Sequence, residues 1–207
     1  MDALALADWR ERVTRLYLSD ADLAGFRAAR DELFATHPQS PVPSGAFTGL
    51  RYFPPDPGAA VEVPLRPADG GIEIDTGGPD GVVRYARVGV LDTQWGPLTL
   101  WWTLGYGGGL FLPFRDGTAG VETYGAGRYL TDTIKGTYGR GLCVLAEDRV
   151  RLDFNYAYNP SCAYDDRWAC PLAPPENRVD APIRAGELAY HGKPYGPERV
   201  FVRGRTE

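Results

Sequence analysis

The densest group of polar side chains in the sequence lies in residues 149–159, RVRLDFNYAYN. If this segment is a β-strand, successive side chains alternate between two faces. One face is then apolar and aromatic and consists of Val150, Leu152, Phe154, Tyr156 and Tyr158. The other is polar and consists of Arg149, Arg151, Asp153 and Asn155. The polar face predicts either a ligand pocket in which Asp153 acts as a base or orienting group, or an ordinary solvated exterior.

Arg128 is the expected partner of the polar face around Asp153. The loop before it, residues 124–127 (YGAG), contains two glycines, which let the backbone approach a neighbouring group closely. A guanidinium group there could hold a carboxylate, or could anchor an anionic or carbonyl group of a ligand. The alternative is an ordinary structural ion pair.

Two cysteines, Cys162 and Cys170, lie eight residues apart in a proline-rich stretch. They could be buried unreactive thiols packed against aromatic rings, a disulfide that clamps the loop, or a catalytic or redox thiol. A metal site is the least favoured interpretation, because two cysteines without a nearby histidine cannot complete a tetrahedral shell. No metal site is therefore predicted.

Aromatic walls with a few convergent polar groups are typical of small-molecule pockets, although they also describe any aromatic core. The residues expected to bind a ligand are Arg128, Tyr129, Asn155, Tyr158, Asn159, Tyr164 and Asn177. The candidates for catalysis are Asp153, Glu187 and Cys162. Asn177 could instead fix a turn, and Glu187 could simply lie at the surface.

Several common chemistries lack their motifs in this sequence. It contains no GxxxxGK[ST] phosphate loop, no GxSxG nucleophile elbow and no HExxH zinc motif. The glycine-rich residues 105–109 lack the register of a dinucleotide-binding loop and are expected to join two strands. No cofactor is predicted.

The overall charge bounds the class of partner. The formal net charge is −5 and the pI is about 5.1, which argues against broad nucleic-acid binding. The longest apolar stretch, residues 88–114, is interrupted by Asp92, Gln94 and several glycines, so no membrane span is expected. The first residues do not resemble a signal peptide, and a cytoplasmic location is expected. A small-molecule ligand is the expected partner, and a homodimer stays open.

The elements that must position these residues change character along the chain. Apolar residues recur at helical spacing through residues 4–35, with a second helix starting at Ser19 or Asp20 and ending before Pro38. From residue 46 onward, short β-rich runs alternate with Gly, Pro and Asp. Strands are expected at 47–53, 60–65, 71–75, 82–91, 97–105, 109–115, 128–135, 142–147, 149–157 and 199–203.

This order predicts a mostly β fold, an antiparallel barrel or sandwich with N-terminal helices packed on it, α+β overall. Residues 1–207 are expected to form a single domain, with a helical segment at 1–37 and a β part at 46–207. The β part includes a proline-rich loop at 159–182, which cannot be a regular helix or a central strand.

The blocks of the C-terminal half also carry a family resemblance. They are residues 111–118 (FLPFRDGT), 123–130 (TYGAGRYL), 152–164 (LDFNYAYNPSCAY), 170–177 (CPLAPPEN) and 185–187 (AGE). In order and spacing the chain resembles domain of unknown function 1684 over about residues 40 to 190. The resemblance implies a mostly β fold with a shared polar site, and it implies no activity or cofactor. The matching positions are Arg128, Asp153, Asn155, Asn159, Cys162, Cys170, Asn177 and Glu187.

Three functions are consistent with these observations. The first is a β-barrel-like protein that binds a small molecule, or an enzyme that acts on an anionic or carbonyl-bearing metabolite. The second is a non-enzymatic structural or interaction domain whose motif residues rigidify the 159–182 loop. The third is a thiol redox protein that uses Cys162 and Cys170.

Overall fold

The computed structural model describes residues 2–76 and 81–190 and the backbone of residues 201–205. Two helices come first, α1 (Ala3–Leu18) and α2 (Leu23–Thr36). The side chain of Asp22 accepts a hydrogen bond from the backbone N–H of Gly25 and so caps α2, in place of the predicted Ser19 or Asp20. The helix ends at Thr36, as predicted from the His37–Pro38 pair.

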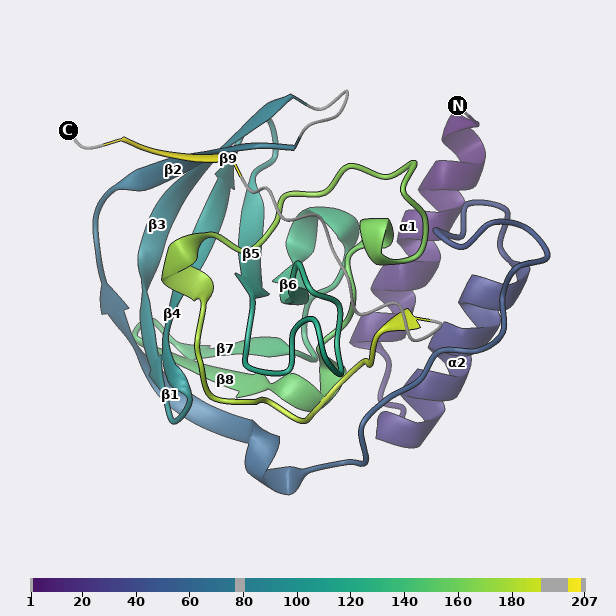
Figure 1. Cartoon of the computed structure of the whole chain (residues 1–207), viewed down its shortest axis with the longest axis horizontal. Coiled ribbons are helices and arrows are strands. Elements are labelled where there is room, and N and C mark those ends of the chain that lie inside the picture. The colour runs from purple at the N-terminus through teal and green to yellow at the C-terminus, as the bar shows by residue number, and fades with distance from the viewer. Residues whose placement is uncertain (1, 77–80, 191–200, 206–207) are drawn as a thin grey trace.

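The rest of the chain forms one antiparallel sheet that curls into a half-barrel (Figure 1). Its strands are β1 (Ala60–Pro67), β2 (Gly71–Asp75), β3 (Val82–Thr93), β4 (Gly96–Leu104), β5 (Gly109–Phe114), β6 (Arg128–Asp132), β7 (Leu142–Ala146), β8 (Arg149–Asp153) and β9 (Phe201–Arg205). The strand order is β6-β5-β4-β3-β1-β8-β7, and β2 pairs with both β3 and β9. The prediction of a mostly β, α+β fold with N-terminal helices is confirmed.

Most of the predicted strands are present, and the exceptions have local causes. Residues 47–53 form no strand and contribute only an isolated bridge from Tyr52 to Glu187. The predicted strand 128–135 stops at Asp132 and continues as the short 3₁₀ helix η2 (Thr133–Lys135). The predicted hairpin turn 77–81 joins two strands that do pair, but residues 77–80 lie outside the described residues, as do 199 and 200.

The predicted strand 149–157 is too long, which corrects its expected alternation. β8 ends at Asp153, because the carboxylate of Asp153 accepts a hydrogen bond from the backbone N–H of Asn155 at 3.0 Å. This bond caps the 3₁₀ helix η3 (Phe154–Tyr156). Val150, Leu152 and Phe154 are buried as expected. The residues after Asp153 no longer alternate between two faces of a sheet.

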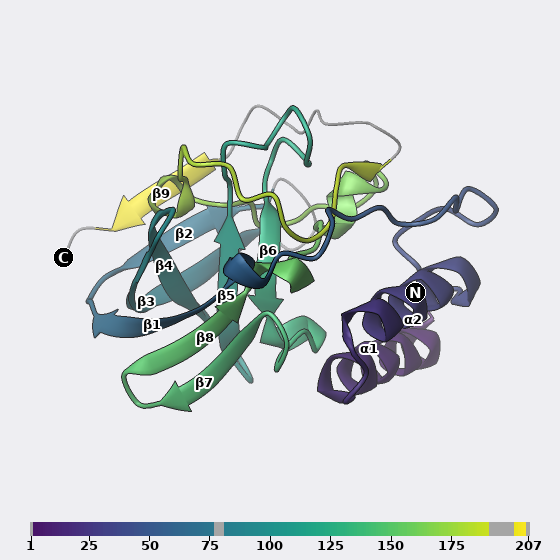
Figure 2. The ribbon, with the colours of Figure 1, turned by 90° about the horizontal axis from the view of Figure 1, so that it is seen from below.

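Two apolar clusters hold the fold together. The larger fills the half-barrel with residues that include Leu98, Leu112, Leu130, Leu152 and Phe154. The second joins the helices to the sheet and consists of Val13, Tyr17, Phe26, Leu33, Ile72, Ile74, Tyr85, Trp101, Phe111, Tyr129 and Tyr158. Figure 2 shows α1 and α2 side by side, beside the half-barrel. The helices therefore cover aromatic residues that the sheet alone would leave exposed.

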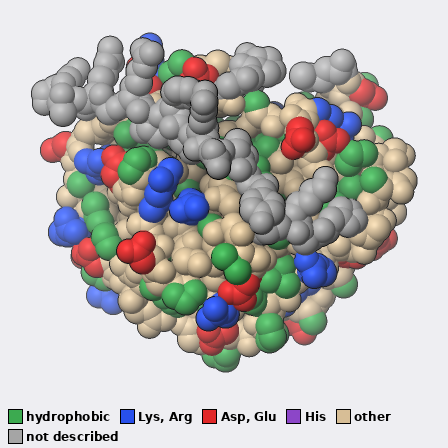
Figure 3. Space-filling model, in the orientation of Figure 1, with side chains coloured by type: hydrophobic (Ala, Val, Ile, Leu, Met, Phe, Trp, Pro, Cys, Tyr) green, Lys and Arg blue, Asp and Glu red, His purple; other side chains and the backbone are tan. Residues whose placement is uncertain are grey.

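The proline-rich stretch 159–182 contains only two short 3₁₀ helices, η4 (Ser161–Ala163) and η5 (Pro175–Asn177). This agrees with the prediction that it is neither a regular helix nor a central strand. Acidic and basic side chains are interspersed over the face shown in Figure 3. None of the helices in the described residues is long and apolar enough to cross a bilayer.

Candidate functional site

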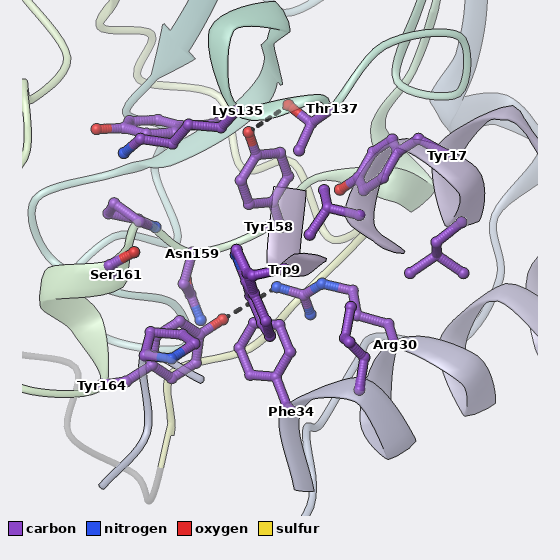
Figure 4. A pocket seen from close by; sticks show the side chains of 16 residues that line it. Trp9, Tyr17, Arg30, Phe34, Lys135, Thr137, Tyr158, Asn159, Ser161 and Tyr164 are labelled. Atoms are coloured by element: carbon purple, nitrogen blue, oxygen red, sulfur yellow. Dashed lines mark hydrogen bonds between the residues drawn. The ribbon is translucent and has the colours of Figure 1, made fainter. Parts of the chain in front are cut away.

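A cavity of about 70 Å³ lies between the two helices and the chain around residues 158–164 (Figure 4). Four of the predicted ligand-binding residues line it, namely Tyr129, Tyr158, Asn159 and Tyr164. The other lining residues are Trp9, Val13, Leu16, Tyr17, Arg30, Leu33, Phe34, Pro41, Lys135, Thr137, Pro160 and Ser161. Most of these come from α1 and α2, which sequence reasoning treated only as packing elements.

Arg30 forms part of one wall of the cavity and belongs to a buried ion pair. The Nη2 atom of Arg30 lies 3.0 Å from Oε2 of Glu187, and these side chains are 5% and 1% exposed. The same guanidinium donates hydrogen bonds to the hydroxyls of Tyr52 at 2.9 Å and Tyr164 at 3.1 Å. It also lies over the ring of Phe34, 4.5 Å from its centroid. Arg30 is therefore held by a carboxylate, two phenols and an aromatic face.

The charge state of this wall follows from its partners. Burial is the largest single influence and acts to lower the pKa of Arg30, but Glu187 and the surrounding tyrosines together outweigh burial and place that pKa well above its ordinary value. Burial raises the pKa of Tyr164 well above its ordinary value, and Glu187 raises it further. Tyr164 therefore stays protonated, and its hydroxyl donates to Oε1 of Glu187 at 2.6 Å.

The position of Glu187 depends on the glycine before it. Gly186 has φ of 77°, and a Cβ there would lie 2.6 Å from the carbonyl oxygen of Ala157. This close approach lets the backbone N–H of Glu187 donate to the carbonyl of Ala157 at 2.9 Å. The Glu187 carboxylate in turn accepts the backbone N–H of Asn159 at 3.0 Å.

Two buried polar atoms at the cavity have no hydrogen-bond partner among the residues that the structure describes. They are the hydroxyl of Tyr17 and the side-chain oxygen Oδ1 of Asn159. Both residues are only 2% exposed. The Nδ2 atom of Asn159 donates to the carbonyl of Leu188 at 2.8 Å, which fixes the orientation of the amide. Burial raises the pKa of Tyr17, so its hydroxyl keeps a proton to donate.

The remaining edge of the cavity is more polar and more open. The side chain of Lys135 is 47% exposed, and its Nζ lies 3.9 Å from the Asp132 carboxylate. The hydroxyls of Thr137 and Tyr158 share a hydrogen bond of 2.7 Å. Figure 4 shows Lys135 and Arg30 on opposite sides of the lining residues. Lys135 is thus a second lining cation, on the more solvent-exposed side of the cavity.

Arg128 does not pair with Asp153, contrary to the prediction. Its guanidinium is buried and lies 3.2 Å from the carboxylate of Asp116. It also donates to the carbonyl oxygens of Ala185 and, at 2.9 Å, of Ile183. The expected pairing was wrong because Asp153 ends its strand and caps η3 instead. Arg128 joins the turn at Asp116 to the chain before Glu187 and is not among the cavity-lining residues.

Asn155 and Asn177 are also engaged with the backbone. Asn155 exchanges two hydrogen bonds with the backbone of Asp56, at 2.9 and 2.8 Å. The side-chain nitrogen of Asn177 donates to the carbonyls of Thr99 and Pro113, at 2.8 and 2.7 Å. Neither residue, nor Asp153, lines the cavity. The predicted ligand-binding set therefore separates into a group at the cavity and a group that braces loops.

The thiols of Cys162 and Cys170 are both free and lie in a small satellite cluster with Tyr124 and Leu172. A hydrogen bond to Cys170, together with burial, raises the pKa of Cys162, the predicted catalytic candidate. The same hydrogen bond lowers the pKa of Cys170 to about 6. The thiolate of this pair therefore forms at Cys170.

Arg30 and Tyr17 were missed as site residues, although the sequence held a signal for Arg30. It stands between Phe26 and Leu33 on the apolar stripe of α2, where an unpaired charge would be costly. A charged residue on a buried face requires a partner of opposite charge. No pattern in the sequence marks Tyr17, because its ring fits the apolar stripe of α1.

The comparisons with known proteins agree with one another. The model of the family described as "Protein of unknown function (DUF1684)" matches residues 45–188. A solved structure, the solution NMR structure of an uncharacterized protein from gene locus rrnAC0354 of Haloarcula marismortui, is 32% identical. The alignment covers 91% of this chain and 97% of the Haloarcula chain, with a TM-score of 0.56. A search of curated proteins gives no match.

Proposed function

For this chain, which belongs to DUF1684, a family of proteins of unknown function, we propose that the cavity between the helices and the sheet binds a small metabolite. The metabolite carries a carbonyl group together with an N–H or O–H group. One observation carries the proposal. Two buried polar atoms, the Tyr17 hydroxyl and Asn159 Oδ1, line the cavity without a partner among the described residues.

Unpaired buried polar atoms are costly, and this cost supports a ligand. Leaving a buried donor or acceptor unsatisfied costs about 1–3 kcal/mol. A ligand carbonyl would accept the hydroxyl proton of Tyr17, and a ligand N–H or O–H would donate to Asn159 Oδ1. Binding would then recover a cost that the free protein bears at both atoms.

The walls define the rest of the ligand. The rings of Trp9, Phe34, Tyr129 and Tyr158 suit a flat or apolar body. Lys135 suits a negative substituent that leaves toward solvent. Pockets for drug-sized ligands are about 300–1,000 Å³, so a cavity of about 70 Å³ encloses only the carbonyl end of a small molecule.

The proposal is binding rather than catalysis, because neither of the two predicted catalytic carboxylates, Glu187 and Asp153, is free to act as a base. Glu187 accepts from Arg30, Tyr164 and the backbone of Asn159. Asp153 is occupied by η3 and stands outside the cavity lining. An acid/base pair of Asp153 and Glu187 therefore has no support from the geometry.

The test is a binding series with simple probes. Acetamide and benzamide carry both the carbonyl and the N–H, methyl benzoate lacks the N–H, and toluene lacks both. We expect the amides to perturb backbone NMR signals around Asn159 and to raise the melting temperature, and the other two to bind more weakly.

Variants locate the site. Tyr17→Phe should weaken benzamide binding about fivefold to tenfold, because it removes one hydrogen bond worth about 1 kcal/mol. Tyr156→Phe is the control, since the Tyr156 hydroxyl accepts from Arg140 and the residue is outside the cavity lining. Equal binding of all four probes, or no loss in Tyr17→Phe, would contradict the proposal.

A second candidate is a rigid interaction domain whose motif residues brace the 159–182 loop. It is supported by the bonds of Asn177 to Thr99 and Pro113, and by the hydroxyl of Tyr129, which donates to the carbonyl of Pro171. If none of the probes binds, while Asn177→Ala lowers the melting temperature by several degrees, this second function is the better account.

A further inference from the structure

The proline-rich loop brings two thiols together beside the cavity wall. Cys162 lies in η4, and Cys170 follows eight positions later, just before Pro171. Both pack against Tyr124, Ala163 and Trp168 in one satellite cluster. Both are free thiols and are not joined by a disulfide. The third cysteine, Cys143, lies apart on β7, where its thiol donates to the carbonyl of Gly139 at 3.0 Å.

The surroundings of Cys170 favour a thiolate. The neighbouring Cys162 thiol and the backbone N–H groups of Ser161 and Cys162 favour the charged form of its sulfur. The positive charge of Lys135 adds to these, and together they outweigh burial and lower the pKa to about 6. At neutral pH the pair therefore holds a thiolate at Cys170 and a thiol at Cys162. This is the arrangement of an attacking sulfur with a resolving sulfur beside it.

We propose that Cys162 and Cys170 form an oxidisable dithiol that reacts with hydrogen peroxide and closes to an intramolecular disulfide. The Cys170 thiolate attacks one peroxide oxygen, the O–O bond breaks, and the departing hydroxide takes a proton to become water. Cys170 is then a sulfenic acid. The Cys162 sulfur gives up its proton, attacks the Cys170 sulfur and expels a second water. One peroxide thus accepts two electrons and yields one disulfide and two waters.

The burial of the two thiols limits the size of the oxidant that can reach them. Cys170 is only 6% exposed, and Cys162 is partly buried beside Tyr124, whose hydroxyl lies 3.7 Å from its sulfur. A two-oxygen molecule can reach such a site through small fluctuations, whereas glutathione disulfide must bring a bulky sulfur in line with the thiolate. The dithiol should therefore distinguish hydrogen peroxide from glutathione disulfide. This inference stands independently of whether the cavity binds an amide.

The experiment counts free thiols in the full-length protein. The reduced protein is treated with excess hydrogen peroxide, quenched with catalase, denatured and labelled with iodoacetamide. Intact mass should fall from three labels to one. Trypsin cuts after Arg167, between the two cysteines, so the disulfide should join peptides 152–167 and 168–178. Treatment with glutathione disulfide for the same time should leave three labels.

Variants assign the two roles. In Cys162→Ser, oxidation should stop at a Cys170 sulfenic acid that dimedone labels, and in Cys170→Ser thiol loss should slow at least tenfold. Cys143→Ser is the matched control and should form the disulfide at the wild-type rate. Three labels after peroxide, a crosslink through Cys143, or faster reaction with glutathione disulfide would overturn the proposal. Because the wild-type peptide map already decides the linkage, a misfolded variant does not remove the test.

Discussion

Tyr17 and Tyr158, two neighbouring tyrosines that line the cavity, should respond in opposite directions to loss of the hydroxyl. The rings of Tyr17 and Tyr158 belong to one aromatic cluster, with centroids 6.1 Å apart. Both are buried, so Tyr→Phe changes the same group in nearly the same surroundings. They differ in hydrogen bonding. Tyr158 shares a 2.7 Å bond with Thr137, and the Tyr17 hydroxyl has no partner among the described residues.

The magnitudes follow from that difference. Tyr17→Phe removes a buried group whose desolvation is uncompensated, which should raise the free energy of unfolding by about 1 kcal/mol. Tyr158→Phe removes a hydrogen bond but leaves Thr137 bonded to the backbone of Asp132. It should therefore lower the free energy of unfolding by about 1 kcal/mol. For a chain of this size, 1 kcal/mol shifts the melting temperature by about 2–4 °C.

The assay is urea unfolding followed by tryptophan fluorescence, with calorimetry as a second probe. The two variants should differ by about 2 kcal/mol, with Tyr17→Phe the more stable. Tyr156→Phe, outside the cavity, provides a reference for the loss of a partly exposed hydroxyl bond. If Tyr17→Phe loses as much stability as Tyr158→Phe, the Tyr17 hydroxyl has a partner in the free protein, and the reasoning behind the proposed ligand fails.

Three further predictions concern the buried charges. Glu187→Ala should lower the free energy of unfolding by about 3–5 kcal/mol in urea, because it leaves Arg30 as an uncompensated buried charge, and Glu187→Gln should lose less. Arg128→Met should lose a similar amount by leaving the Asp116 carboxylate without its cation; an unchanged urea midpoint would show that the hydrogen bonds from Thr118 and Ile183 suffice to hold that carboxylate. Under reducing conditions, the stability of wild type relative to Cys170→Ser should rise between pH 6 and 9. The depressed pKa of Cys170 gives a contribution that is present above its ordinary pKa and is lost as pH falls through about 6, and a flat difference would argue against the thiolate.

Features encoded by short-range signals were predicted well from the sequence. The end of α2 follows from the steric conflict that Pro38 imposes on His37, and the strand pairs around β3 follow from alternating β-rich runs and turns. The strand limits at Asp132 and Asp153 were missed. In the second case a side chain competes with the sheet for a backbone N–H, and an alternating pattern does not reveal that competition.

The site was predicted only in part, because its residues meet across long stretches of sequence. Tyr158, Asn159 and Tyr164 were named from their local aromatic and amide pattern, and they line the cavity. Their partner Arg30 lies more than a hundred positions away on α2, and no local rule joins it to Glu187. Arg128 was assigned the wrong partner for a different reason, since Asp116 lies nearer to it in sequence than Asp153 does, and the choice between two carboxylates depends on the tertiary fold.

Glu187 links the bracing residues to the cavity. Its backbone pairs with Ala157, and its carboxylate holds Arg30, Tyr164 and the N–H of Asn159. Arg128 fixes the chain just before Glu187 through the carbonyls of Ile183 and Ala185. Because the Asn159 amide is held at Leu188, one residue beyond Glu187, the same brace leaves Oδ1 unpaired at the cavity. Rigid loops and a ligand site are thus not competing explanations of these motif residues, since a site that keeps two polar atoms unsatisfied requires such a rigid frame.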